Sequence, residues 1–151
     1  METTGSSWTV RVEGGRDRVT KVYSRNHVFT VGQQASFDVE DERLSAVEYL
    51  LGALGADLTE GFQVAAARRR IPVAAIEMRL SGRLNNALTH LGVIGEEGHP
   101  GFESIIGTLY VSADAAPSVL EELWRTTLER SPLFNTLKPC VAMTISLEAV
   151  L

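Results

Sequence analysis

The feature that most constrains the fold is a long apolar stretch within residues 45–70. From Tyr49 to Leu58 every residue except one is apolar or glycine. This composition is typical of a helix that is buried on all sides rather than lying on a surface. The exception is Asp57, whose ionised carboxylate is costly to bury unless it is paired or hydrogen-bonded. The sequence therefore predicts a buried helix in which Asp57 has a partner, holds a proton or faces a cleft.

Signals at both ends bound this helix. Ser45, followed three residues later by Glu48, has the spacing of a capping box, which places the N-terminus here. The run Arg68–Arg70 suits the negative end of a helix dipole, and Pro72 stops the helix. We interpret the arginine run as a helix end rather than a phosphate site. The rest of a 151-residue chain cannot cover so long an apolar helix, so we expect a homodimer.

Alternating apolar and polar residues predict strands on both sides of this helix. The N-terminal quarter is predicted to be an antiparallel meander with strands at 8–12, 18–23 and 27–31 and a fourth short strand at Phe37 and Val39. After the helix we predict strands at 76–80 and 105–111, a second helix from Pro117 to the stop at Ser131-Pro132, and a strand at 141–147. This order predicts one α+β domain over residues 1–151, with antiparallel sheets around a long central helix.

Composition narrows the class of protein. Hydrophobic residues make up 44% of the chain and charged residues 22%, which is typical of globular domains. The net charge is −5 and the basic residues cluster only at Arg68–Arg70, which argues against a nucleic-acid partner. No stretch approaches the ~20 apolar residues of a membrane span, and the polar N-terminus lacks a signal-peptide core, so we expect a cytoplasmic protein with no membrane partner.

Cysteine and metal-ligand patterns predict no cofactor and no metal. The single cysteine, Cys140, excludes an intrachain disulfide and a thiolate cluster, and we expect it to be a small buried hydrophobe. Glu96, Glu97 and His99 lie in a glycine-rich loop, but their spacing matches no metal-site pattern. We interpret this loop as a solvated acidic segment that acts as a flap.

Three motifs carry a resemblance to a known family. The helix segment Glu48–Asp57 is similar to E-x-L-L-x-A-L-x-x-C, and Ser131–Leu137 is similar to C-P-[VY]-x-[NK]-x-[LT]. The segment Gly14–Asp17 matches a G-G-R-D hairpin turn. Together these motifs resemble the OsmC/Ohr superfamily of osmotically inducible and organic hydroperoxide resistance proteins, over nearly the whole chain. The resemblance implies an intertwined homodimer whose two sites lie at the subunit interface.

The resemblance also implies a chemistry, thiol peroxidation. One cysteine attacks the peroxide as a thiolate and becomes sulfenic acid, a second resolves it as a disulfide, and arginine and glutamate lower the thiol pKa. Here Asp57 stands at the reactive position, Ser131 at the resolving position and Val47 at the glutamate position, while Arg16 matches the arginine. A carboxylate cannot form sulfenic acid and serine cannot form a disulfide. We therefore expect this degenerate site to have lost the family activity.

The favoured function is a binding protein of this stress-response superfamily. Its ligand would be a small apolar or electrophilic molecule in the dimer cleft. The predicted lining is Leu50, Leu54, Leu58 and Phe62. We also expect Arg16 to pair with Asp57 across this cleft.

Three alternatives remain open from the sequence. The first is an enzyme that reduces hydroperoxides through Cys140, activated by Lys138, or that uses a neutral Asp57 as a general acid. The second is a hydrolase built on Ser131 and Asp57. The third is a structural protein in which an Arg16–Asp57 pair closes the cleft.

Overall fold

The structure is a computed structural model that describes residues 5–32 and 42–150. The chain divides into two compact units, Met1–Tyr49 and Leu50–Leu151, and each is described by itself. The short strand predicted at Phe37 and Val39 lies outside the described residues.

The first unit contains the predicted meander. Strands β1 (Arg11–Gly14), β2 (Thr20–Ser24) and β3 (His27–Val31) form an antiparallel sheet in the order β1-β2-β3. In the β1–β2 turn, the Gly15 N–H donates to the Val19 carbonyl (2.9 Å) and the Val19 N–H donates to the Asp17 carboxylate (3.1 Å). These bonds close the predicted G-G-R-D turn and leave Arg16 exposed at its tip.

Helix α1 (Ala46–Arg68) has the predicted signals at both ends. The Ser45 N–H donates to the Glu48 carboxylate (2.7 Å), and the Glu48 N–H donates to Ser45 Oγ (3.3 Å). Two hydrogen bonds to the Glu48 carboxylate hold its pKa below the usual range. The bond from the Ser45 backbone N–H has the larger effect and the bond from the Ser45 hydroxyl the smaller one. At the other end Arg70 adopts a left-handed conformation (φ 57°) and the Ile71 N–H donates to the Ala66 carbonyl (3.0 Å), which is a typical helix C-cap.

The second unit packs helices against a three-stranded sheet. Strands β4 (Val73–Leu84), β5 (Phe102–Ala113) and β6 (Ala142–Ala149) lie in the order β4-β5-β6. The pair β4–β5 is antiparallel, but β5–β6 is parallel, so the prediction of purely antiparallel sheets is wrong for β6. The reason is the connection: α3 (Pro117–Arg130) and α4 (Pro132–Leu137) carry the chain back before β6 begins, which is the crossover a parallel pair requires.

Two short helices were not predicted. One is α2 (Ala87–His90), which Asn86 caps by accepting hydrogen bonds from the Leu88 and Thr89 N–H groups (3.0 and 3.1 Å). The other is α4, which begins where the sequence signal indicated only the end of α3. Ser131 is the residue after α3 and also the N-cap of α4, with proline in the first turn.

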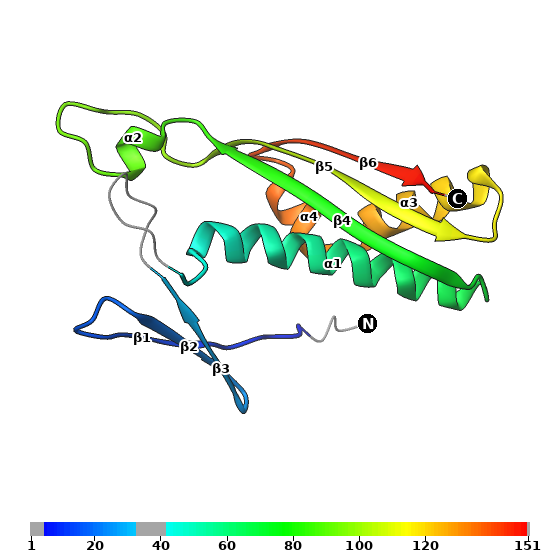
Figure 1. Cartoon of the computed structure of the whole chain (residues 1–151), viewed down its shortest axis with the longest axis horizontal. Coiled ribbons are helices and arrows are strands. Elements are labelled where there is room, and N and C mark those ends of the chain that lie inside the picture. Colours follow the sequence, from blue (N-terminus) through cyan, green and yellow to red (C-terminus); the bar gives the residue numbers. More distant parts are fainter. Residues whose placement is uncertain (1–4, 33–41, 151) are drawn as a thin grey trace. The chain divides into compact units, whose positions relative to one another are not determined.

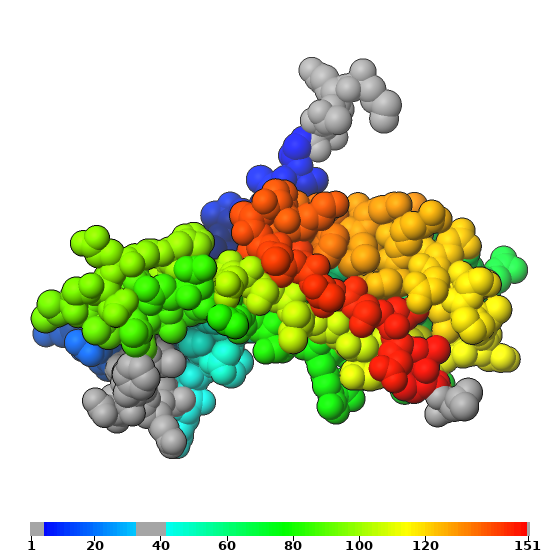
Figure 2. All heavy atoms as spheres, turned by 90° about the horizontal axis from the view of Figure 1, so that it is seen from above, coloured from blue at the N-terminus to red at the C-terminus, as the bar shows by residue number. Residues whose placement is uncertain are grey.

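The core lies between the sheet and the helices on one of its faces (Figure 1). It is formed by α1, β5 and α3, and its buried side chains include Leu54, Leu58, Phe62, Ile105, Leu109, Val111, Leu120, Leu123 and Trp124. Figure 2 shows the opposite face of the sheet, where β6 (red) is uncovered. No helix in the described ranges has the length and hydropathy needed to cross a membrane.

The single chain leaves part of helix α1 uncovered, as expected from the sequence, since Leu50 is 38% exposed and Val64 43% exposed. One expectation about this helix is wrong. Leu54, Leu58 and Phe62 do not line a ligand cleft, because all three are 0% exposed and pack into the core. The continuous apolar sequence concealed which face of the helix points toward the sheet.

Candidate functional site

Asp57 and Ser131, which come from segments far apart in the sequence, meet in the structure. Ser131 Oγ donates a hydrogen bond to Asp57 Oδ2 (2.5 Å), and the Leu133 N–H donates to the same oxygen (3.2 Å). Asp57 is partly buried and Ser131 is 4% exposed. The partner that the sequence required for this carboxylate is therefore the N-terminus of α4. Arg16 belongs to the other unit, and its pairing with Asp57 stays a prediction.

Local sequence fixes Ser131 in this position. Its Oγ accepts a hydrogen bond from the Phe134 N–H (2.9 Å) while its proton points to Asp57. Asn135 Nδ2 donates to the carbonyls of Leu128 (2.8 Å) and Ser131 (2.7 Å), which ties α4 to the end of α3. The serine hydroxyl is thus used both as donor and as acceptor, which favours a structural contact over a free nucleophile.

We expect Asp57→Ala to lower the free energy of unfolding by about 2–3 kcal/mol, because it leaves the Ser131 hydroxyl and the Leu133 N–H without an acceptor. The matched control is Asp57→Asn, which keeps an oxygen acceptor of the same size and should lose less than half as much. Urea unfolding of the three proteins measures both values. Equal stability of Asp57→Ala and wild type would contradict the role given to this carboxylate.

A pocket of about 260 Å³ lies beside this pair, between α1 and α3. Its lining residues are Asp57, Glu60, Gly61, Val64, Ala65, Arg68, Thr126, Thr127, Arg130 and Ser131. The lining is apolar in the middle, since the hydroxyls of Thr126 and Thr127 donate back to the carbonyls of their own helix (3.0 and 2.8 Å). A Cβ added at Gly61 would lie 3.2 Å from the Thr127 methyl group, so glycine keeps this part of the pocket open.

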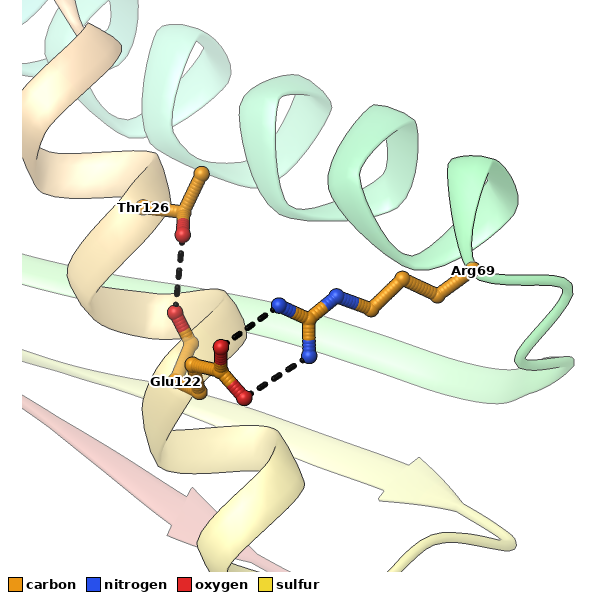
Figure 3. A network of polar contacts seen from close by, with 3 residues as sticks. All are labelled: Arg69, Glu122 and Thr126. Atoms are coloured by element: carbon orange, nitrogen blue, oxygen red, sulfur yellow. Dashed lines mark hydrogen bonds and ion pairs between the residues drawn. The ribbon is translucent and has the colours of Figure 1, made fainter.

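The three arginines at the end of α1 have three different roles. Arg69 makes a two-pronged ion pair with Glu122 of α3 (2.9 and 2.7 Å), and Thr126 Oγ1 donates to the Glu122 carbonyl (Figure 3). Arg70 forms the helix cap, as the sequence indicated. Arg68 lines the pocket. Sequence reasoning missed this last role, although the spacing of Asp57, Val64 and Arg68 places all three on one helix face.

The Arg69–Glu122 pair predicts a small acid sensitivity. Arg69 holds the pKa of Glu122 below its usual value, mainly through its hydrogen bond to the carboxylate and to a smaller extent through its positive charge. A lowered carboxyl pKa contributes stability above the unfolded pKa, and this contribution is lost as the pH falls through the folded pKa. We therefore expect Glu122→Gln to lower Tm slightly at pH 7 and to match wild type near pH 3. A Tm difference that persists unchanged at pH 3 would contradict this.

The contacts of the other candidate residues, Cys140, Lys138 and the acidic loop, do not indicate a catalytic site. The prediction that Cys140 is buried is wrong: it is exposed, and its thiol donates to the Leu137 carbonyl (3.3 Å). Lys138 Nζ lies 5.9 Å from the centre of the Phe134 ring. In the acidic loop, Glu96 accepts a long hydrogen bond from Asn86 (3.4 Å). Within the described residues no group of three His, Cys, Asp or Glu side chains is placed to hold a metal.

Comparison with known proteins identifies similar chains and similar folds. The profile of the family described as OsmC-like protein matches residues 39–146. An OsmC-like protein from Mycoplasma pneumoniae has a TM-score of 0.81 at 14% identity, over 97% of this chain and 99% of that chain. A hypothetical protein from Aquifex aeolicus has a TM-score of 0.76 at 18% identity, over 97% of this chain and 98% of that chain. The organic hydroperoxide resistance protein OhrB of Bacillus subtilis has a TM-score of 0.61 at 17% identity, over 95% of this chain and 98% of that chain. No curated protein matches the sequence. These likenesses confirm the predicted α+β fold.

Proposed function

Because this chain belongs to the OsmC-like protein family, we propose that it is a cytoplasmic homodimer, built from one OsmC-like domain over residues 1–151, that binds a small molecule and has lost thiol peroxidase activity. One observation carries the proposal. Asp57 and Ser131, the residues at the positions where the family resemblance expects redox cysteines, are joined by a hydrogen bond. The pair has the proximity that the peroxidase reaction needs but not its sulfur atoms.

The chemistry supports the loss of activity. Peroxide reduction requires a thiolate that accepts an oxygen atom and a second thiol that resolves the sulfenic acid. Oxygen atoms at both positions can do neither. The one thiol of the chain, Cys140, is exposed in another segment and donates to a backbone carbonyl.

Uncovered apolar surface supports the homodimer. Leu50 of α1 is 38% exposed. A second groove, of about 360 Å³, lies between α1 and β4 and is lined mainly by apolar or small residues: Leu51, Gly52, Gly55, Ala56, Thr59, Met78 and Leu80. Subunit interfaces commonly cover surface of this kind. Light scattering at the exit of a size-exclusion column should therefore give twice the chain mass of 16.4 kDa.

The pocket beside Asp57 supports the binding role. Its volume of about 260 Å³ is slightly below the range of about 300–1,000 Å³ that is usual for small-molecule sites, and it combines an apolar middle with a few charged groups. This lining replaces the wholly apolar cleft expected from the sequence. A small ligand that is part apolar and part polar fits it best.

The test of the proposed function is consumption of an organic hydroperoxide in the presence of a dithiol. We expect the purified protein to show no turnover above the uncatalysed rate. The variant Cys140→Ser serves as control and should behave identically. Turnover that disappears in the control would show that Cys140 has taken over the reaction, and turnover that persists in it would show a reaction that needs no thiol of the chain; either result would reject the proposal.

A further inference from the structure

Two arginines that line the groove between α1 and α3, Arg68 and Arg130, form no ion pair with any residue that the structure describes. Six α1 residues line it, and four of them follow one another at spacings of four, three and four: Asp57, Gly61, Val64 and Arg68. These spacings place them in one row along the helix, so the groove runs parallel to the α1 axis for roughly 16 Å. The Asp57 carboxylate stands at one end of the row and the Arg68 guanidinium at the other.

The charged groups that line this groove differ in whether they already have hydrogen-bond or ion-pair partners. The Asp57 carboxylate accepts hydrogen bonds from Ser131 and Leu133. By contrast, among the described residues Arg68 and Arg130 take part in no ion pair or side-chain hydrogen bond, and the same holds for Glu60. The lining thus holds two guanidinium groups and two carboxylates, a formal net charge of zero, and of these four groups only Asp57 has hydrogen-bond partners among the described residues.

The arginine next to Arg68 does have a partner. Arg69 is engaged with Glu122 of α3 in a two-pronged pair (Figure 3). That pair links α1 to α3 at this end of the helix. Arg68 is left to face the groove, and guanidinium groups bind carboxylates with strong, directional hydrogen bonds.

We propose that this groove binds a small amphiphilic carboxylate, with its anionic group on Arg68 and its apolar part along the Gly61–Ala65 segment toward Asp57. Glu60 lies eight residues before Arg68, about 12 Å away along the helix axis, so it repels a carboxylate bound to Arg68 only weakly. Arg130 adds a second positive charge to the field of the groove. This inference rests on the proposed binding function and names its ligand class.

The test is isothermal titration calorimetry with sodium octanoate as the probe. We expect saturable binding to the wild-type protein, and weaker binding by a factor of about ten or more for 1-octanol, which lacks the charge, and for acetate, which lacks the apolar part. The variant Arg68→Gln should raise Kd about ten-fold, and Glu60→Gln should lower Kd. The matched control is Arg125→Gln, which removes an exposed arginine of α3 that does not line the groove.

Three results would overturn the inference: no octanoate binding, equal affinity of Arg68→Gln and wild type, or an equal loss in Arg125→Gln. None of them would change the outcome of the hydroperoxide assay, which tests the loss of peroxidase activity separately. Conversely, hydroperoxide turnover would reject the proposed function even if octanoate binds as expected.

Discussion

The double variant Asp57→Cys/Ser131→Cys is expected to gain hydroperoxide reductase activity. The two wild-type side chains already meet, with Ser131 Oγ 2.5 Å from Asp57 Oδ2, so sulfur atoms at these positions should lie close enough to join. In the expected reaction one thiolate takes an oxygen atom from the hydroperoxide and releases the alcohol. The second thiol then attacks the sulfenic acid and releases water as the disulfide forms.

Two measurements check this gain. Thiol titration should fall from three thiols per chain, the two new ones and Cys140, to one after addition of tert-butyl hydroperoxide. With a dithiol present, the rate of hydroperoxide consumption should exceed that of wild type at least ten-fold. The single variant Ser131→Cys is the control and should show no turnover, because it lacks the attacking thiol. Retention of all three thiols in the double variant would contradict the assignment of the two positions.

The variant Phe62→Ala is expected to lose about 3–5 kcal/mol of stability, which is the usual cost of emptying a fully buried aromatic site. Phe62 is 0% exposed and packs into the core with Leu58 and residues of β5 and α3. For a domain of this size the loss corresponds to a fall in Tm of roughly 10 °C. Differential scanning calorimetry at one fixed protein concentration measures it.

The matched control for this prediction is Val64→Ala on the same helix. Val64 is 43% exposed, so shortening it should cost well under half as much as Phe62→Ala. A similar loss in both variants would contradict the division of α1 into a core face and an outer face. Octanoate binding by Phe62→Ala at a temperature where it is folded should equal that of wild type, since Phe62 does not line the groove.

Much of the fold followed from local sequence signals. The capping box at Ser45, the arginine end of α1 and the strands predicted at 18–23, 27–31, 76–80, 105–111 and 141–147 appear close to where the pattern placed them, whereas β1 begins at Arg11 rather than at Trp8. The parallel pairing of β6 did not follow, because strand direction depends on the route of the chain through α3 and α4 rather than on the residues of β6. The short helix α4 was hidden because Ser131-Pro132 has the same appearance as the end of one helix and the start of the next.

The candidate site was partly accessible from sequence. The buried charge of Asp57 indicated that a partner was needed, and the family resemblance identified Ser131, yet only the fold shows the hydrogen bond between them. The role of Arg68 was concealed because three adjacent arginines look equivalent in sequence. The helix turns successive residues by about 100°, and that rotation sends one to Glu122 and another to the groove.

The contact between α1 and the start of α4 closes a chain loop of 74 residues. In a protein with cysteines at these two positions, a disulfide would close this loop under oxidising conditions and break under reducing ones. Here oxygen atoms form the link, so neither glutathione nor peroxide acts on it. The chain therefore holds the two helices together in the same way under oxidative stress and under reducing conditions.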